Sequence, residues 1–320
     1  MSRVSVQIVT FNSADDIGTC LESLRGQTWS DFRIRILDNA STDRTLDVLT
    51  TTLDADRTDI VRSDTNTGFA AAHNRLARDF PADFVLFLNP DTILDSTFIS
   101  ELVGALELSD EAGSASGKLL RMDGVTIDST GIVMTRNQRH LDRGAEQPDS
   151  GQYDRPERVF GPSGAAAMYR YSCLNDVRVG TMIFDEDFFA YREDADLAWR
   201  SQLLGWASLY VPTAVARHRR RVTPQRRSNL SALINRHSVK NRFLLRINNM
   251  TAGLYRRDFW RITARDVAVV GYVFAWEWSS IPAIWYILSN RRRLWTKRRD
   301  IQSRVRAEDR EINAWFQSGS

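Results

Sequence analysis

The sequence is poor in cysteine, because only Cys20 and Cys173 occur among its 320 residues. They form no C-x-x-C pair and lack the Cys/His spacing of a zinc site, which excludes a disulfide framework and a cysteine-based metal site. Both thiols are expected to be small, buried, apolar side chains. We therefore expect a reducing, cytoplasmic compartment.

Other diagnostic segments are absent as well. The N-terminus, MSRVSVQIVTFN, has no basic stretch followed by an apolar core, so we predict no secretory signal and a location on the cytoplasmic side. No G-x-G-x-x-G follows the first predicted strand and no G-x-x-x-x-G-K-[S/T] occurs. These absences argue against a dinucleotide-dependent dehydrogenase and a P-loop nucleotidase.

Charge is distributed unevenly along the chain. Residues 217–320 contain 23 Lys and Arg but 7 Asp and Glu, whereas residues 1–216 contain 20 and 33. An acidic body thus carries a basic tail, which suits either nucleic acid or an anionic membrane surface. The apolar fraction of 42% is enough for a large buried core at this length.

The N-terminal part alternates between two kinds of pattern. This rhythm is typical of βαβ units and predicts an α/β fold with a mainly parallel central sheet. β-Branched apolar runs stand at 4–10, 32–38, 58–61 and 83–88, and helical patterns stand between them at 15–25, 43–53 and 69–79.

Polar residues follow each predicted strand. Because ligands of open α/β sheets bind beyond the carboxyl ends of the strands, we expect these side chains to converge on one crevice. In strand order they are Thr10 and Asn12, Asp38 and Asn39, Asn66 and Gly68, and Asn89 and Asp91.

Asp91 stands directly after a buried apolar strand, in the segment LFLNPDT. A carboxylate at this edge can bind Mg²⁺ or Mn²⁺ while phosphate oxygens and water complete the coordination shell. Asn, Pro and Asp are also common turn formers, so a plain turn is the competing interpretation.

A second acidic group, Glu193, Asp194 and Asp196, falls in the first turn of a predicted helix within FFAYREDADLAWR. A carboxylate there can be the general base that accepts the proton of a sugar hydroxyl, a contribution of roughly 10²–10⁴ in rate. The helix dipole alone also favours acidic residues in a first turn, which is the alternative. His218 follows the strand-like segment LYVPTAVA and is either a metal ligand that suits Mn²⁺ or a hydrogen-bonding surface residue.

The pattern becomes irregular after residue 120. We predict an exposed loop at 135–156, an extended or turn segment at 161–170, and a helix in the second half of 184–206. The residues of that helix expected to face inward are Leu197, Leu203 and Leu204.

From residue 228 onward only helical patterns occur, so we divide the chain into a catalytic domain, residues 1–227, and a helical, basic and aromatic C-terminal region, residues 228–320. The apolar run 267–288 is long enough to span a bilayer. A charged Glu277 near its centre would cost about 2.5 kcal/mol or more there, and the flanking tryptophans prefer the headgroup level. Docking at the membrane surface is therefore favoured over packing on the body or a partner, and both over a span.

Together these segments resemble family 2 glycosyltransferases of the GT-A fold, in particular the rhamnosyltransferase-like and galactofuranosyltransferase-like branches that extend cell-surface polysaccharides. The resemblance covers about residues 4–218. Each motif alone is weak, but their order along the chain is specific. The matching segments are VQIVTFN, LESLRGQT, ILDNASTDRT, NTGFAAAHN, FLNPDT, GPSGAAAMYR, FDEDFFAYREDADLAWR and VARH.

The resemblance implies a role for each candidate residue. Asp194 would be the catalytic base, with Glu193 as its nearest rival. Asp91 would be the retained metal ligand of the family's D-x-D motif, and the departure at the position of its first aspartate leaves room for His218 as a further ligand of Mg²⁺ or Mn²⁺. The donor-binding residues would be Asp38, which would bind a pyrimidine base, with Thr10, Asn12, Asn66, Gly68, Asn74 and Asn89.

The implied activity is a single inverting displacement. A rhamnose-like sugar or other hexose would move from a UDP- or dTDP-sugar to a hydroxyl of a cell-surface polysaccharide or lipid-linked glycan. We expect the enzyme to be peripheral at the inner face of the plasma membrane, on an anionic surface, with no nucleic-acid partner. Two rivals remain: a non-catalytic subunit that binds a nucleotide sugar or glycan, and a nucleic-acid-binding protein that acts through the basic tail.

Overall fold

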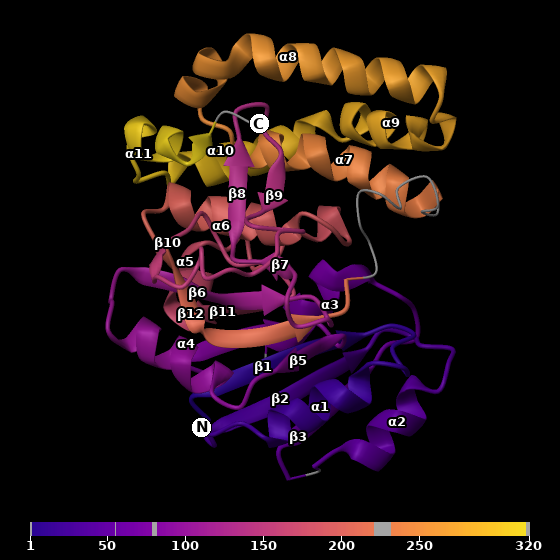
Figure 1. Ribbon diagram of the computed structural model, residues 1–320. Helices are drawn as coiled ribbons and strands as arrows, with labels where there is room; N and C mark the ends of the chain where they lie inside the picture. Colours follow the sequence, from indigo (N-terminus) through magenta and orange to yellow (C-terminus); the bar gives the residue numbers. More distant parts are fainter. Residues whose placement is uncertain (1, 55, 79–81, 221–231, 318–320) are drawn as a thin grey trace.

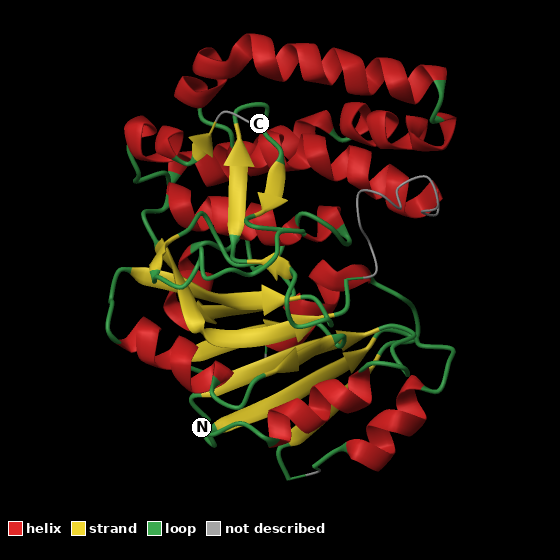
Figure 2. Ribbon diagram, viewed as in Figure 1, coloured by secondary structure: helices red, strands yellow, loops and turns green. Residues whose placement is uncertain are grey.

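A large mixed sheet with a layer of helices above it makes up the molecule (Figure 1). The computed structural model describes residues 2–54, 56–78, 82–220 and 232–317. Figure 2 shows the sheet in the lower half, covered by helices, and a separate stack of helices in the upper half.

The N-terminal half of the sheet is parallel. β1 (Val4–Thr10) lies between β2 (Phe32–Asp38) and β4 (Phe84–Leu88), and β3 (Thr58–Arg62) forms the edge beside β2. Most residues of β1, β2 and β4 are Val, Ile, Leu and Phe, whose branched or aromatic side chains pack well on a sheet buried on both faces. The connecting helices are α1 (Ile17–Arg25), α2 (Thr45–Thr52) and α3 (Gly68–Ala77).

The other half of the sheet is mixed, with both parallel and antiparallel pairs. β11 (Ala166–Arg170) runs antiparallel between β4 and β6 (Ala112–Leu120), and β12 (Ala207–His218) runs parallel to β6. The predicted α/β fold with a mainly parallel sheet is therefore confirmed. The remaining elements of this part are β5 (Thr92–Leu94), β7 (Ile127–Ser129), β10 (Glu157–Arg158), α4 (Phe98–Glu107), α5 (Tyr171–Asp176), η1 (Glu186–Phe188) and α6 (Glu193–Leu203).

The prediction of an exposed loop at 135–156 is wrong in part. β8 (Ile132–Thr135) and β9 (His140–Asp142) form a hairpin, and β13 (Phe316–Gln317) near the end of the chain pairs with β8 in parallel. β13 also corrects the expectation that the C-terminal region is helical throughout. Polar composition indicated a loop because nothing local reveals pairing with so distant a strand.

The C-terminal helices share a hydrophobic core with the sheet-bearing part. Trp199 and Leu203 of α6 are buried in one cluster with Leu244 and Leu245 of α7 (Ala232–Asn249). The predicted domain boundary between residues 227 and 228 lies outside the described residues. The other C-terminal elements are α8 (Ala252–Ala275), η3 (Trp278–Ser280), α9 (Ile281–Ser289), α10 (Arg291–Ser303) and α11 (Asp309–Ala314).

The apolar run 267–288 is not one helix. α8 ends at Ala275, and after a short break the chain continues in a helical stretch that is bent by 113° relative to α8. Glu277 lies at this break and accepts a hydrogen bond from the hydroxyl of buried Ser280. Among the described helices, none alone has the length and hydropathy of a membrane span, and only this bent pair meets both criteria together.

Candidate active site

The ends of β1 and β2 carry a buried polar pair. The Thr10 hydroxyl donates to Asp38 Oδ1 at 2.9 Å, and both side chains are almost completely buried. Ser41 donates to the same carboxylate through its hydroxyl (2.6 Å) and its backbone N–H (3.1 Å). The parallel register that places Thr10 opposite Asp38 thus holds this carboxylate in one orientation.

Asparagines organise the neighbouring loops. Asn12 has a positive φ of 51° and its side-chain oxygen accepts the backbone N–H of Thr42 at 2.8 Å. Asn39, predicted at the strand end but given no role, donates to the Asn66 side chain at 2.9 Å and accepts the N–H of Thr67. Thr10, Asn12, Asp38 and Asn66 therefore lie at one edge of the sheet, as the sequence predicts.

Gly68 allows a close approach between α3 and the segment before α6. Its φ is +83°, and a Cβ at this position would lie 2.5 Å from the Phe189 ring and 2.6 Å from the Phe189 carbonyl oxygen. That carbonyl accepts the N–H of Ala70 at 3.1 Å. Only glycine fits both the backbone angle and the space.

The side-chain amide of Asn74 makes four hydrogen bonds within the protein. Its side-chain NH₂ donates to the Phe184 carbonyl (2.8 Å) and to Glu186 (3.1 Å), and its oxygen accepts the N–H groups of Ile183 (3.0 Å) and Phe184 (2.9 Å). These bonds use the hydrogen-bonding capacity of the amide. Asn74 therefore ties α3 to the segment 183–186, and its place in the donor-binding set stays a prediction.

Asp91 and His218 come together at the carboxyl end of β4. β5 pairs with β12 so that His218 lies opposite Thr92, and His218 Nε2 is 3.3 Å from Asp91 Oδ1. Burial acts to lower the pKa of His218, but hydrogen bonds to Asp128 and Asp91 raise it to about 9. A carboxylate oxygen and an imidazole nitrogen are a donor set that suits Mn²⁺.

Asp128 of β7 lies behind His218 and was not identified from the sequence. Its carboxylate is fully buried, accepts from His218 Nδ1 at 2.7 Å, and pairs with Arg121 (3.1 Å) and Arg220 (3.0 Å). A carboxylate on one ring nitrogen orients the other nitrogen, as it does for histidines that bind metals. No local pattern in the sequence distinguishes Asp128 from an ordinary strand residue.

Glu193 and Asp194 begin α6 in different environments. Glu193 is 8% exposed, and one of its carboxylate oxygens has no hydrogen-bond partner among the described residues. Asp194 is half-buried and accepts the N–H groups of Ala195 (2.7 Å) and Gly164 (3.1 Å). Burial and then the adjacent Asp194 raise the pKa of Glu193 well above its usual value, whereas burial and Asp142 raise the pKa of Asp194.

One short segment joins this acidic pair to the turn at Asp91. The N–H of Gly164 donates to Asp194, and the carbonyl of the next residue, Ala165, accepts the N–H of Asn89 at 2.9 Å. Asn89 and Asp91 thus lie on one side of this segment and Asp194 on the other. The two predicted parts of the site are adjacent in the structure although they are far apart in sequence.

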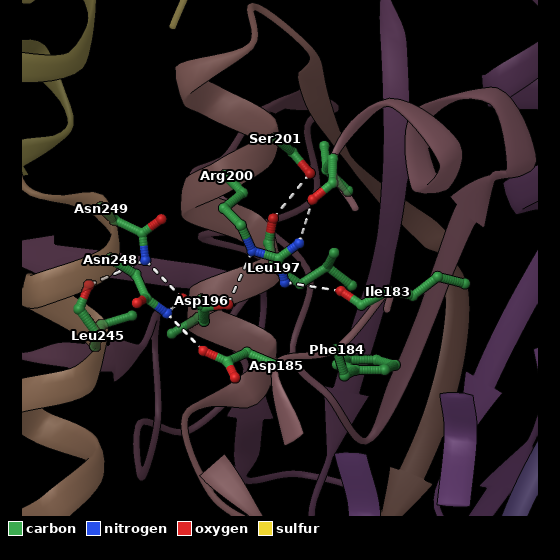
Figure 3. A network of polar contacts seen from close by, with 12 residues as sticks. Ile183, Phe184, Asp185, Asp196, Leu197, Arg200, Ser201, Leu245, Asn248 and Asn249 are labelled. Carbon is green, nitrogen blue, oxygen red and sulfur yellow. Dashed lines mark hydrogen bonds and ion pairs between the residues drawn. The ribbon is translucent and has the colours of Figure 1, made fainter. Parts of the chain in front are cut away.

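Helix α7 holds α6 in place through asparagines. Figure 3 shows Asn248 and Asn249 directed at Asp196, with bonds of 3.1 Å and 2.7 Å, and Asn248 also donates to Asp185 at 2.9 Å. Arg200 completes the network through Asp196 at 2.9 Å and the Ile183 carbonyl at 2.8 Å. Asp196 therefore has a structural role within the acidic group.

Asn241 of α7 organises the loop that leads into Glu193. Its buried NH₂ group donates to the carbonyls of Phe188 (2.9 Å), Ala190 (2.8 Å) and Tyr191 (2.7 Å). Three residues of this loop, Phe189, Tyr191 and Arg192, have positive φ values between 64° and 71°. Such conformations are costly for residues other than glycine, so the loop depends on contacts of this kind.

Comparison with known proteins adds a family and a fold. The model of a family described as glycosyl transferase family 2 matches residues 5–178. An N-acetylglucosaminyl-diphospho-decaprenol L-rhamnosyltransferase of Mycobacterium tuberculosis is 29% identical over 236 residues, which are 67% of this chain and 75% of that protein. A Bacillus subtilis protein named as the glycosyltransferase EpsH is 22% identical over 74% of this chain, and the chain spans 64% of its length.

Solved structures confirm the predicted GT-A fold. Staphylococcus aureus TarS in complex with UDP-GlcNAc superposes with a TM-score of 0.57 at 16% identity, over 94% of this chain and 90% of that one. GalNAc-T7 with UDP, GalNAc and Mn²⁺ superposes with a TM-score of 0.62 at 13% identity, over 80% of this chain and 50% of that one.

Proposed function

This chain belongs to glycosyltransferase family 2, and we propose that it moves a rhamnose-like sugar or other hexose from a nucleotide-diphosphate sugar to a hydroxyl of a lipid-linked or cell-surface glycan, with inversion. Membership makes it a glycosyltransferase, and the substrates and the stereochemistry are the content of the proposal. The name of the mycobacterial relative, which contains a rhamnosyl group and a diphospho-decaprenol acceptor, supports this choice. The UDP-sugar in the TarS structure supports a UDP- or dTDP-linked donor.

The observation that carries the proposal is the segment Gly164–Ala165, which bonds Asp194 on one side and the turn before Asp91 on the other. A transferase needs a base beside the acceptor hydroxyl and countercharge beside the leaving diphosphate. This segment holds the two groups in fixed relation. A protein that only binds a nucleotide sugar has no need of Asp194 there.

Asp194 acts as the base. As the acceptor oxygen bonds to the anomeric carbon, the bond from that carbon to the diphosphate breaks, and the acceptor proton passes to the Asp194 carboxylate. Each oxygen of Asp194 accepts one backbone N–H and keeps a lone pair for the hydroxyl. Glu193 is the weaker candidate because its strongly raised pKa favours the protonated form, which cannot accept a proton.

Asp91 and His218 would hold Mg²⁺ or Mn²⁺. Within the described residues no group of three or more His, Cys, Asp or Glu side chains is arranged to hold a metal ion, so the donor diphosphate would have to supply oxygen ligands. A bound divalent ion would neutralise charge on the leaving diphosphate. The Mn²⁺ in the GalNAc-T7 structure supports this assignment.

Thr10, Asn12, Asp38, Asn66, Gly68 and Asn89 would form the donor side. Among the described residues, Asp38 Oδ2 accepts only the Ser41 N–H, and it retains a lone pair for an N–H of a pyrimidine ring. The hydrogen bond from Thr10 keeps the carboxylate turned to the strand ends.

An anionic membrane surface is the proposed location of the acceptor. α8, α9 and the break between them expose large aromatic side chains, among them Trp260 (80%), Trp276 (76%), Trp278 (70%) and Trp285 (69%). Arg291, Arg292 and Arg299 on α10 are exposed as well. Interfacial tryptophans and basic residues together favour docking at the inner face of the plasma membrane.

The proposal is tested with the purified protein and a panel of UDP- and dTDP-sugars. We expect nucleoside diphosphate release with one donor class, dependent on a lipid-linked acceptor and on Mg²⁺ or Mn²⁺, and an inverted anomeric configuration in the product by NMR. Asp91→Ala should abolish turnover and weaken Mn²⁺ binding measured with UDP or dTDP present. Full turnover in excess chelator would refute the metal assignment, and retention of configuration would refute the single displacement.

A further inference from the structure

Two buried arginines on α7 lack partners for much of their hydrogen-bonding surface. Arg242 and Arg246 stand one turn apart, and their side chains are 7% and 5% exposed. Nε and Nη2 of Arg242 and Nε and Nη1 of Arg246 have no hydrogen-bond partner within the described part of the chain. Leaving buried donors unpaired is unfavourable, and more so for charged groups.

One carboxylate of the described residues lies within ion-pair distance of both arginines. Asp266 of α8 is the carboxylate facing both arginines, with its Oδ1 2.7 Å from Arg246 Nη2 and 3.5 Å from Arg242 Nη2. Burial, and then Arg246, Arg265 and Arg192, lower the pKa of Arg242 to about 9, while Asp266 opposes them. Asp266 is thus shared between Arg242 and Arg246.

The arginine pair lies on the acceptor side of the active site. Arg192 immediately precedes Glu193 and Asp194, and Asn241, the residue before Arg242, donates to three carbonyls of the loop that leads to Arg192. In Figure 1, α7 lies between α6, which begins with the acidic pair, and the outermost helix α8, which belongs to the aromatic surface. The donor-side residues are at the strand ends of the sheet, below α6 in this view.

We propose that Arg242 and Arg246 form a binding site for the diphosphate of a polyprenyl-linked acceptor. The planar guanidinium fork binds phosphate oxygens through two parallel hydrogen bonds, which is what the unpaired Nε and Nη groups offer. The acceptor sugar then extends toward Asp194, and the lipid extends toward the aromatic surface of α8 and α9. This assignment rests on the proposed function, because it names the acceptor class of the same site.

The first test measures binding without turnover. Farnesyl diphosphate is titrated into the full chain in the presence of excess UDP and dTDP, which occupy the donor side. We expect wild-type binding that farnesol does not compete for, and at least a tenfold weaker affinity for Arg242→Gln/Arg246→Gln. Arg261→Gln, an exposed arginine of α8, is the matched control and should bind as wild type does.

Two further ligands identify the source of the recognised chemistry. Inorganic pyrophosphate that competes fully shows that the diphosphate alone is recognised, and farnesyl monophosphate should bind several-fold more weakly than the diphosphate. Equal affinity of farnesol and farnesyl diphosphate, or equal affinity of the wild type and the double variant, would overturn the proposal.

Thermal stability separates a ligand site from a structural role. Without ligand, Arg242→Gln should leave the melting temperature unchanged or raise it, because the buried Arg242 guanidinium lies 3.5 Å from Asp266 Oδ1. Asp266 keeps its 2.7 Å ion pair with Arg246 in this variant. Farnesyl diphosphate should raise the melting temperature of the wild type but not of the double variant. A fall of several degrees without ligand, combined with an unchanged ligand-induced shift, would assign the arginines to folding alone.

A charge-preserving variant covers the case in which the glutamine variants do not fold. Arg242→Lys/Arg246→Lys keeps the charge but loses the fork, so farnesyl diphosphate should bind more weakly than to the wild type by several-fold. Unchanged binding would contradict the proposal. Because none of these readouts needs sugar transfer, failure of the panel of nucleotide sugars and failure of this site are distinguishable.

Discussion

Glu193 and Asp194 are adjacent residues with the same charge, yet their surroundings divide their roles. The Asp194 carboxylate accepts two backbone N–H groups and is partly exposed. The Glu193 side chain is buried, and one of its carboxylate oxygens has no hydrogen-bond partner among the described residues. Burial of a carboxyl without donors favours its protonated form. The division of roles is therefore a property of single side-chain environments.

We predict that Asp194→Asn lowers kcat by roughly 10²–10⁴ and leaves donor binding within a few-fold, because the base acts on the acceptor proton. Steady-state kinetics and nucleotide titration measure the two quantities. Glu193→Gln is the matched variant and should keep most of its activity. The assignment is reversed if Glu193→Gln is inactive while Asp194→Asn remains active.

Asp187 yields a prediction about pH. Burial acts to raise its pKa, but Arg293 and Lys297 outweigh burial and bring the pKa well below its usual value. The ion pairs therefore stabilise the fold above the unfolded-state pKa of about 4, and this contribution is lost as the pH falls toward the folded-state value. Asp187→Asn should lower the free energy of unfolding at pH 7 by about 1–2 kcal/mol and by less at pH 3.

Urea denaturation of both proteins from pH 3 to pH 7 measures this difference. Asp300→Asn removes an exposed i,i+4 pair with Arg304 and serves as the control, with a change below about 0.5 kcal/mol. A destabilisation by Asp187→Asn that is the same at every pH would show that the ion pairs are not its cause.

At the scale of elements, the loop 188–192 connects the donor side to the base. Phe189 contacts Gly68 and accepts the N–H of Ala70, and its ring stacks on His237 of α7 at 4.8 Å between centroids. Asn241 binds three carbonyls of the same loop. Helix α7 thus positions the loop that leads to the proposed catalytic residues. Asn241 itself contacts none of the proposed donor-binding residues.

We predict that Asn241→Ala lowers kcat at least tenfold and raises the donor KM, because three carbonyls lose their donor and the positive-φ loop relaxes. Hydrogen exchange should show reduced protection of residues 188–192. Ser238→Ala on the same helix is the control and should be unchanged. Full activity with faster exchange would mean that the loop does not position the base.

At the scale of the whole molecule, the C-terminal helices are built into the catalytic part. Lys297 of α10 binds Asp185 at 2.6 Å, and Phe316 of β13 is buried beside Trp199 of α6. Truncation after α7 would expose this core. Tests of the membrane surface therefore need point substitutions in the complete chain.

We predict that the full chain co-sediments with anionic vesicles at low salt and is largely released at high salt, because basic residues and shallow tryptophans each contribute a part of the binding. The triple change Trp276→Ser, Trp278→Ser and Trp285→Ser should abolish most of this binding and keep transfer to a short soluble acceptor. Leu108→Ser, at a 91% exposed position directly after α4, is the control. Binding that resists salt and carbonate would indicate insertion of the bent pair α8 and α9 instead.

Local pattern predicted much of the fold, and it singled out several residues of the candidate site. The predicted strand at 4–10 and the predicted strand at 32–38 match β1 and β2, and Leu197, Leu203 and Leu204 are buried as expected. Periodicity of apolar residues records which face of an element is buried, and polar residues after strands record where the crevice lies. Asp91 and His218 each follow a strand-like segment of the sequence, and the structure brings the two side chains into contact.

The sequence by itself determined the order of the elements, the edge of the sheet at which Asp38 and Asp91 lie, and the helix start that presents Asp194, because each depends on a few consecutive residues. Only the tertiary structure decided that Asp128 orients His218 and that Asn241 holds the loop before Glu193. It also decided that Arg242 Nε and Nη2 have no hydrogen-bond partner among the described residues. These contacts join segments that are far apart in the chain. Their geometry arises from tertiary packing, which the spacing of residues within a short segment does not encode.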